Sequence, residues 1–364
     1  MKNASYNQPM GRREFLRGGL RYGLLVGFAA MAARAFSGGR LAKQDCTNQG
    51  ICRGCPGYTD CELPQALSAK QAVAVANMGG AYEEIGRIAG CKTPSRHLEI
   101  GPDDRLYLAT GNAVLVMTQA GGRERELTLD APVRCVAVAG DGTTFVGLRD
   151  KIVGFDAQGN RVSTWEAPGK RSWLTGLAVG ENDLFAADAG NRVILRFNRA
   201  GQLLGRIGEK NAERDIDGFV IPSPYFSVKI HPDGLLRVNN PGRHRVEAYT
   251  FEGDFEGAWG KASAAMDGFC GCCNPIRVAP LPDGRLITCE KGLPRVKLYS
   301  ATGEFETVVA GTSAFPENAK VGAGERDADA ALAGLTAAVD SRGRIAILDH
   351  VTGEIRILQP RASA

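Results

Sequence analysis

Short apolar runs joined by acidic or glycine-containing turns recur along most of the chain. Six segments read as two strands around a tight turn: LEIGPDDRLYLAT, VAVAGDGTTFVGL, LAVGENDLFAAD, VKIHPDGLLRVNN, VAPLPDGRLITCE and AAVDSRGRIAILD. Turns of the D-G and N-D kind between alternating apolar runs favour β-hairpins. Five of the six segments continue into a third strand, a glycine-bearing turn and a fourth strand. Four antiparallel strands at a period of about 45 residues predict the blades of a β-propeller.

The sixth segment lacks the length for a fourth strand, because only four residues follow EIRILQP at 354–360. The stretch EEIGRIAG at 83–90 resembles QLLGRIGE, the outer strand of the third blade. An open ring would expose a strand edge, and an N-terminal strand that completes the last blade removes that edge. The sequence therefore predicts an all-β fold: a six-bladed propeller over residues 82–362, closed by the strand at 83–90.

One segment resembles a known repeat family. DAGNRVILRFNRAGQLLGRIG at 188–208 is similar to an NHL repeat, and weaker copies extend over the propeller region. The resemblance implies a propeller but no particular activity, because NHL propellers serve as binding platforms, lyases and sensors. The lyases of that family hold zinc with several histidines. The four histidines here do not match that pattern, so lyase activity is not expected: His97, His231, His244 and His350.

The first 35 residues resemble a twin-arginine (Tat) export signal. Arg12 and Arg13 precede an apolar run from Tyr22 to Ala33, and ARA at 33–35 forms a small-residue cleavage site. The apolar run is shorter than the roughly 20 residues that span a membrane, which favours a cleaved signal over a retained anchor. We therefore expect export to the periplasm or another extracytoplasmic space, with membrane contact only if the signal is retained.

The net charge changes once this segment is set apart. The whole chain carries +4, but residues 1–35 hold six of the 44 basic residues and one of the 40 acidic ones. The remainder has 38 basic and 39 acidic residues and no Lys/Arg cluster. Nucleic acid is therefore not an expected partner. The 47 glycines and 17 prolines suit a turn-rich β protein.

Residues 36–81 form a cysteine-rich module followed by a short predicted helix. Cys46, Cys52, Cys55 and Cys61 follow the pattern C-x5-C-x2-C-x5-C, interrupted by glycines and a proline. Such a segment cannot build its own core, so two disulfides or one metal centre must hold it together. The central C-x2-C is a chelating spacing of zinc and iron–sulfur sites, although the flanking gaps match no common ferredoxin or rubredoxin pattern. Tat export of folded, cofactor-loaded proteins favours the metal centre.

A second cysteine group lies in the propeller, where long connections from an outer to an inner strand elaborate one face. Cys270, Cys272 and Cys273 lie in one such loop, DGFCGCCNP at 267–275, and Cys289 ends the second strand of the same blade. We expect the four thiols to lie near one another on this face, where long loops concentrate function. Zinc, copper or an iron–sulfur cluster, disulfides, and plain buried thiols all remain open.

Asn240, His244 and Glu290, at neighbouring strand ends, are expected to bind a ligand or to support a metal site. Two function classes follow. One is an exported propeller with a thiolate-bound metal or iron–sulfur centre, in periplasmic electron transfer or redox sensing, that meets a redox partner on the elaborated face. The other is a disulfide-stapled binding scaffold for a peptide, glycan or protein partner. No nucleophile–base set is recognisable, so no catalytic residue is named.

Overall fold

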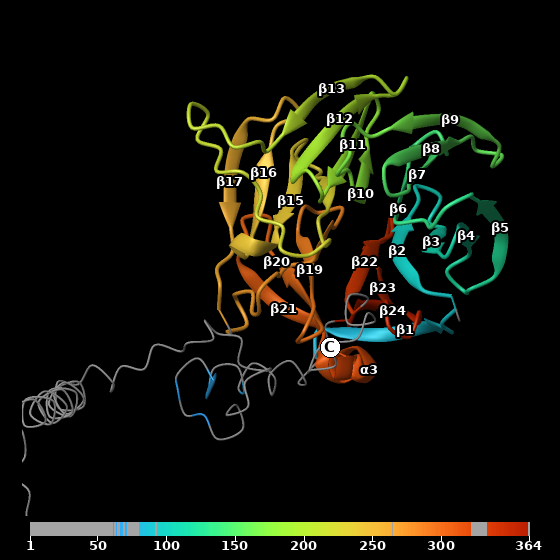
Figure 1. The fold of residues 1–364 in the computed structure, drawn as a ribbon. Coiled ribbons are helices and arrows are strands. Elements are labelled where there is room, and N and C mark those ends of the chain that lie inside the picture. The colour runs from blue at the N-terminus through green and yellow to red at the C-terminus, as the bar shows by residue number, and fades with distance from the viewer. Residues whose placement is uncertain are drawn as a thin grey trace, which may run out of the picture. The chain divides into compact units, whose positions relative to one another are not determined.

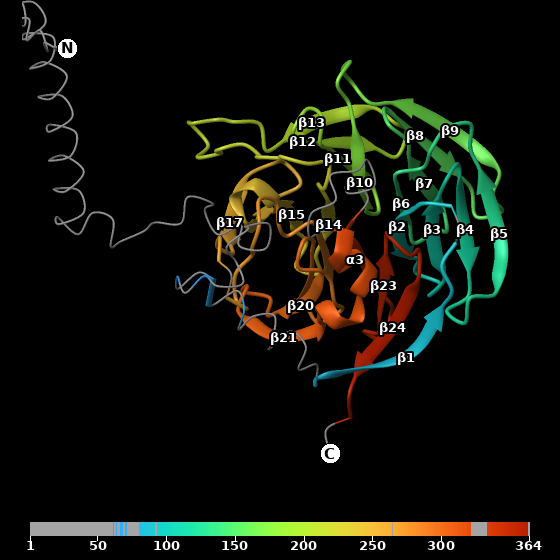
Figure 2. The same cartoon turned by 60° about the horizontal axis from the view of Figure 1, so that its bottom comes forward.

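The computed structural model describes residues 80–91, 93–263, 265–321 and 333–362, and residues 61, 63, 66, 67 and 70. From residue 82 onward the described chain forms six four-stranded antiparallel sheets arranged in a ring (Figure 1 and Figure 2). The predicted all-β, six-bladed propeller is confirmed. The predicted export signal and Cys46, Cys52 and Cys55 lie outside the described residues. Within the described ranges, no helix has the length and apolar character to cross a bilayer.

Each blade runs from an inner to an outer strand. Blade 1 comprises β2 (Ser95–Ile100), β3 (Leu106–Thr110), β4 (Ala113–Met117) and β5 (Arg123–Thr128). Blade 2 comprises β6 (Cys135–Val138), β7 (Thr144–Gly147), β8 (Lys151–Phe155) and β9 (Arg161–Glu166). Blade 3 comprises β10 (Leu174–Val179), β11 (Asp183–Asp188), β12 (Val193–Asn198) and β13 (Leu203–Ile207).

The second half of the ring repeats this order. Blade 4 comprises β14 (Val228–Ile230), β15 (Leu236–Asn240), β16 (Arg245–Tyr249) and β17 (Phe255–Trp259). Blade 5 comprises β18 (Arg277–Pro280), β19 (Leu286–Glu290), β20 (Arg295–Tyr299) and β21 (Phe305–Ala310). Blade 6 comprises β22 (Leu335–Val339), β23 (Ile345–Asp349), β24 (Ile355–Pro360) and, as its outer strand, β1 (Tyr82–Ile88).

The pairing of β1 with β24 closes the ring. The two strands are antiparallel, from Tyr82 opposite Pro360 to Ile88 opposite Ile355, and lie side by side in both views (Figure 1 and Figure 2). The predicted N-terminal closing strand is confirmed. The inner strands contact one another around the whole circle, from β2 through β6, β10, β14 and β18 to β22 and back to β2.

Apolar side chains between neighbouring blades form the core. Trp165 of β9 stacks on Phe197 of blade 3, and Trp259 of β17 lies 4.7 Å from the Tyr299 ring of blade 5, centroid to centroid. The turn glycine of the next blade approaches each tryptophan. A Cβ on Gly303 would lie 2.2 Å from the Trp259 side chain, and this glycine has a φ of 89°. The repeated turn glycine thus permits both the left-handed backbone and the close packing of blades.

Three outer-to-inner connections elaborate one face, as predicted. They join β13 to β14, β17 to β18, and β21 to β22; the third contains η2 (Thr312–Ala314) and α3 (Pro316–Val321). The short η1 (Pro241–Arg243) lies between β15 and β16. Asn318 of α3 donates to the Gly334 carbonyl at 2.8 Å and to Asp349 Oδ1 at 2.9 Å, which fixes the helix on blade 6.

Candidate functional site

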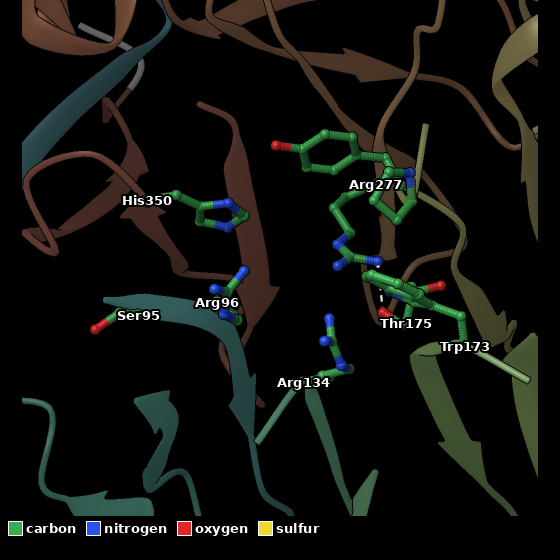
Figure 3. Close-up of a pocket in the computed structure, with 9 residues that line it drawn as sticks. Ser95, Arg96, Arg134, Trp173, Thr175, Arg277 and His350 are labelled. Atoms are coloured by element: carbon green, nitrogen blue, oxygen red, sulfur yellow. Dashed lines mark hydrogen bonds between the residues drawn. The ribbon is translucent and has the colours of Figure 1, made fainter. Parts of the chain in front are cut away.

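A cavity of about 120 Å³ lies where the inner strands begin, at the mouth of the central channel on the elaborated face (Figure 3). All six blades contribute to it. The lining residues are Ser95, Arg96, Arg134, Trp173, Thr175, Pro224, Tyr225, Arg277 and His350. We call this cavity the channel mouth.

The channel mouth carries positive charge without a counter-charge. Arg96, Arg134 and Arg277 extend their guanidinium groups toward the same space (Figure 3), and none of the described lining residues is Asp or Glu. Burial lowers the pKa of Arg134 and of Arg277, and the nearby Arg96 acts in the same direction on Arg134. Buried arginines are normally paired with a carboxylate, so this arrangement favours an incoming anion.

Arg277 is held rigidly in this position. Its side chain is buried, and Nη1 donates to the Thr175 carbonyl at 2.8 Å and the Phe226 carbonyl at 3.1 Å. These carbonyls belong to blades 3 and 4, whereas Arg277 begins the inner strand of blade 5. The guanidinium therefore joins three blades through neutral acceptors and keeps its full charge at the mouth.

Three buried donors at the channel mouth have no hydrogen-bond partner in the described chain. They are Nε of Arg134, Nε of Arg277 and Nε1 of Trp173. The Arg134 guanidinium lies 4.4 Å over the Trp173 ring, so two of the donors come from stacked groups. A buried donor without a partner costs about 1–3 kcal/mol, which a hydrogen-bonding ligand would recover.

The other titratable groups of the mouth are neutral near pH 7. Burial, with Arg277 and Arg96, lowers the pKa of His350 to about 3, and its Nε2 lies 2.8 Å from Thr336 Oγ1. Burial raises the pKa of Tyr225 to about 12, and its hydroxyl donates to the Ala333 carbonyl. The arginines alone therefore set the charge of the mouth.

The cysteine loop contains one contact between thiols. Cys272 is exposed and Cys273 is buried, and their sulfurs lie 3.2 Å apart. A hydrogen bond from Cys272 lowers the pKa of Cys273 against the effect of burial, and Lys291 and Ser223 act in the same direction. The same bond raises the pKa of Cys272. The two thiols are therefore in contact with each other, with Lys291 and Ser223 beside Cys273.

The other predicted ligands, Cys270 and Cys289, have different surroundings. Cys289 packs between blades 5 and 6 in the hydrophobic core, and burial raises its pKa to about 12. Cys270 lies near enough to Arg295 to contribute to raising the pKa of that guanidinium. Within the described ranges, no group of three or more His, Cys, Asp or Glu side chains is placed to hold a metal ion. The described cysteines, including Cys61, form no disulfide.

Asn240 and His244 support loops and do not line the channel mouth. Asn240 is buried; its Oδ1 accepts from the Val220 amide at 2.9 Å, and its Nδ2 donates to Glu247. His244 adopts a left-handed backbone with φ 55°, and its Nε2 lies 2.5 Å from the Gly271 carbonyl oxygen. Blade 4 thus holds the cysteine loop of the next blade through one imidazole.

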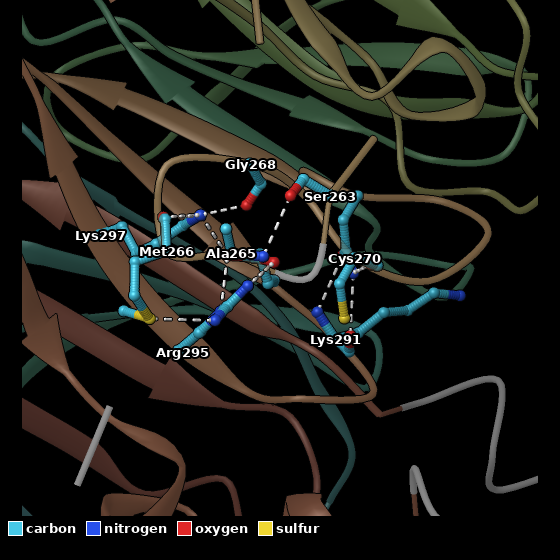
Figure 4. A network of polar contacts seen from close by, with 10 residues as sticks. Ser263, Ala265, Met266, Gly268, Cys270, Lys291, Arg295 and Lys297 are labelled. Atoms are coloured by element: carbon cyan, nitrogen blue, oxygen red, sulfur yellow. Dashed lines mark hydrogen bonds and ion pairs between the residues drawn. The ribbon is translucent and has the colours of Figure 1, made fainter. Parts of the chain in front are cut away.

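Glu290 belongs to a buried ion triad beneath the same loop (Figure 4 shows its surroundings). Its carboxylate accepts from Arg295 Nε at 2.9 Å and lies 2.8 Å from Lys297 Nζ, all three side chains being at most 1% exposed. Lys297 also donates to the carbonyls of Met266 and Gly268. Glu290 therefore stabilises the loop through Lys297.

The ionisation of the triad follows from its burial. Burial alone would raise the pKa of Glu290, but Arg295 and Lys297 outweigh it, and the pKa is lowered. Burial lowers the pKa of Lys297 to about 8, although Glu290 opposes this shift. The triad therefore places one carboxylate beside two cations, whereas no carboxylate is among the described residues that line the channel mouth.

The arginines of the mouth were not singled out from the sequence. Sequence reasoning favoured Asn240, His244 and Glu290 instead. For Asp188, at the end of a second strand, it favoured a turn-capping role, and Asp188 does accept from the Trp173, Gly190 and Asn191 amides. The available signal was positional: Arg96 and Arg134 precede the hairpin turns of blades 1 and 2 at equivalent places.

Comparisons with known proteins bear on the fold. No protein-family model matches the chain, and no curated protein sequence matches it. A streptogramin B lyase structure is similar at 13% identity with a TM-score of 0.53, covering 77% of this chain and 97% of that one. A virginiamycin B lyase from Staphylococcus aureus is similar at 14% identity with a TM-score of 0.52, covering 76% and 99%. These likenesses show the propeller fold alone, and the NHL assignment stays a prediction.

Replacing Glu290 by Gln should destabilise the propeller strongly, because two buried cations would lose their counter-charge. We expect a loss of about 3–5 kcal/mol in the free energy of unfolding, measured from urea midpoints. Lys297→Met should cost less, since it leaves the Glu290–Arg295 pair intact. Equal losses in the two variants would contradict the assignment of Glu290 as the centre of the triad.

The neutral, buried His350 should make stability fall with acidification. Its pKa is lowered from 6.5 to about 3, so the unfolded state binds the extra proton between these values. The stability is present above pH 6.5 and is lost as the pH falls toward 3. His350→Gln should therefore lose less stability than the wild type between pH 7 and pH 4 in urea titrations. The surface change Arg161→Gln should keep the wild-type slope; identical slopes for all three proteins would contradict the prediction.

Proposed function

We propose that this chain is a ligand-binding propeller that takes an oxyanion, such as a carboxylate or phosphate group, at the channel mouth. One observation carries the proposal: Arg134, Arg277 and Trp173 each keep a buried N–H without a partner in the described chain. Arg96 lines the same cavity, and none of its described lining residues is an acid. Arginine forks match planar oxyanions and bind them through charge-assisted hydrogen bonds.

The size of the cavity defines what enters it. At about 120 Å³ it has room for a small anion or for the acidic end group of a larger ligand, since whole drug-sized ligands occupy roughly 300–1,000 Å³. The long loops around the mouth offer further surface to the rest of such a ligand. This reading keeps the binding scaffold predicted from the sequence and gives it a chemical preference.

The chemistry of the mouth favours binding over catalysis. His350 has a pKa of about 3 and is engaged with Thr336, so it is a poor general base near pH 7. The described lining residues include no carboxylate that could take this role. The lyase activity named for the two similar structures is therefore not proposed for this chain.

Removing arginines should weaken anion binding stepwise. Succinate and inorganic phosphate, titrated calorimetrically at fixed ionic strength, should bind the wild type, and neutral succinamide should not. Arg96→Gln or Arg134→Gln should each cost about 1.5–3 kcal/mol, or roughly ten- to a hundredfold in Kd.

The matched control is Arg161→Gln, which removes the same charge from an exposed position on β9 and should leave Kd unchanged. Tighter binding of succinate than phosphate would identify a carboxylate ligand, and the reverse order a phosphate. Absence of binding to both probes, or equal affinities in all variants, would overturn the proposal.

We also propose, from the sequence pattern, that the chain is exported by the Tat route and carries a metal or iron–sulfur centre on Cys46, Cys52, Cys55 and Cys61. A redox partner would then meet the elaborated face. Protein matured in the cytoplasm and purified without oxygen should contain iron with acid-labile sulfide, or zinc or copper. The metal content, and the sulfide content if the metal is iron, should fall in Cys52→Ser and remain unchanged in Cys135→Ser. A wild-type protein without metal would overturn this proposal.

A further inference from the structure

The loop that carries Cys272 and Cys273 is held in a defined shape. Asn274 Nδ2 donates to the Cys270 carbonyl at 2.6 Å and to the Lys291 carbonyl at 3.0 Å, and its Oδ1 accepts from the Lys291 amide at 2.9 Å. On the other side, His244 holds the Gly271 carbonyl. The two thiols therefore sit on a backbone fixed from two blades, and the cost of ordering them is already met.

The two sulfurs lie close enough together for one atom to bond to both. Side chains of adjacent residues in extended chain point to opposite sides, whereas the Cys272 and Cys273 sulfurs approach to 3.2 Å. Cys272 is exposed, and Cys273 lies behind it with Lys291 and Ser223 as its polar neighbours. A ligand that binds the exposed Cys272 sulfur from solvent thus has the second sulfur 3.2 Å from the first.

Adjacent cysteines resist closing a disulfide with each other. Their Cα atoms are about 3.8 Å apart across a trans peptide, which is below the roughly 4.4–6.8 Å of ordinary disulfides. A third atom inserted between the sulfurs enlarges the ring and removes this restriction. The pair is therefore better suited to chelation than to oxidation.

The separation of the sulfurs selects the geometry of that atom. With bonds of about 2.3 Å, a linear bridge needs sulfurs about 4.6 Å apart and a tetrahedral centre about 3.8 Å. The observed 3.2 Å corresponds to a bridging angle near 90°, as at a three-coordinate, pyramidal centre with a lone pair. Soft thiolates prefer soft acceptors.

We propose that Cys272 and Cys273 form a chelating dithiol for a trivalent, thiophilic metalloid of the arsenic class. Two thiols react with an organoarsenic oxide, R–As=O: two S–H bonds and the As=O bond break, two As–S bonds form, and both protons leave with the oxygen as water. No oxidation state changes. The third position of the arsenic keeps its own substituent, so no third protein ligand is required.

Phenylarsine oxide with the reduced full-length chain tests this inference. After treatment in the presence of excess 2-mercaptoethanol, alkylation and tryptic mapping should show the peptide 262–277 with Cys272 and Cys273 blocked together. Dimercaptopropanol should reverse the block. Mapping separates this adduct from any on the cysteine module of residues 36–81.

Three variants and one peptide complete the test. Cys272→Ser and Cys273→Ser should each lose the adduct, whereas Cys270→Ala should keep it. The folded chain should hold the adduct against at least about tenfold more 2-mercaptoethanol than the synthetic peptide 262–277, because the fold preorganises the thiols. Loss of the adduct in Cys270→Ala, its persistence in either serine variant, or equal resistance of chain and peptide would overturn the inference. Anion binding at the channel mouth is measured separately and does not depend on this result.

Discussion

The antiparallel pairing of β1 with β24 is the constraint on which the rest of the molecule depends. It satisfies the strand edge that blade 6 would otherwise expose, and it ties residue 82 to residue 360 across the whole length of the propeller. Once the ring is closed, each inner strand is held by two neighbours. Residues at or near the starts of five inner strands, together with His350 directly after β23, can then converge on one small cavity, although 255 positions separate Ser95 from His350.

The electrostatics of the channel mouth differ from those elsewhere in the same protein. Where a cation is only structural, a carboxylate lies beside it: Glu290 pairs with Arg295 and Lys297, and Asp183 pairs with Arg196. Arg277 is as deeply buried but meets only carbonyl oxygens. The fold therefore pairs these structural cations with a carboxylate but leaves Arg277 without one. The missing partner lowers the stability of the protein, and a bound anion would restore it. Buried charges that lack a partner within the protein are typical of functional sites.

The fold could be predicted because each blade repeats the same sequence pattern. The residues of the site differ from blade to blade, so no repeat reveals them. Hairpin turns and alternating apolar runs identify the blades, and EEIGRIAG at 83–90 identifies the closing strand. The repeat does not show which partners each single side chain contacts. Cys289 and Glu290 are neighbours on β19, so they point to opposite faces of the blade, and Cys289 enters the core between blades 5 and 6. Loop residues have no such alternation, and the meeting of Cys272 with Cys273 depends on contacts from His244 and Asn274 that no spacing rule contains.

Lys291 lies between the dithiol and the channel mouth and interacts with both. Lys291 Nζ lies 4.6 Å over the ring of Tyr225, which lines the mouth, and donates to Ser223 Oγ at 3.2 Å. Lys291 also lowers the pKa of Cys273, whose charge in turn acts on Tyr225. Because blade 5 supplies both Arg277 and the cysteine loop, the residues that set the field at the mouth and those that hold the thiols are fixed by the same inner strand and the same closed ring.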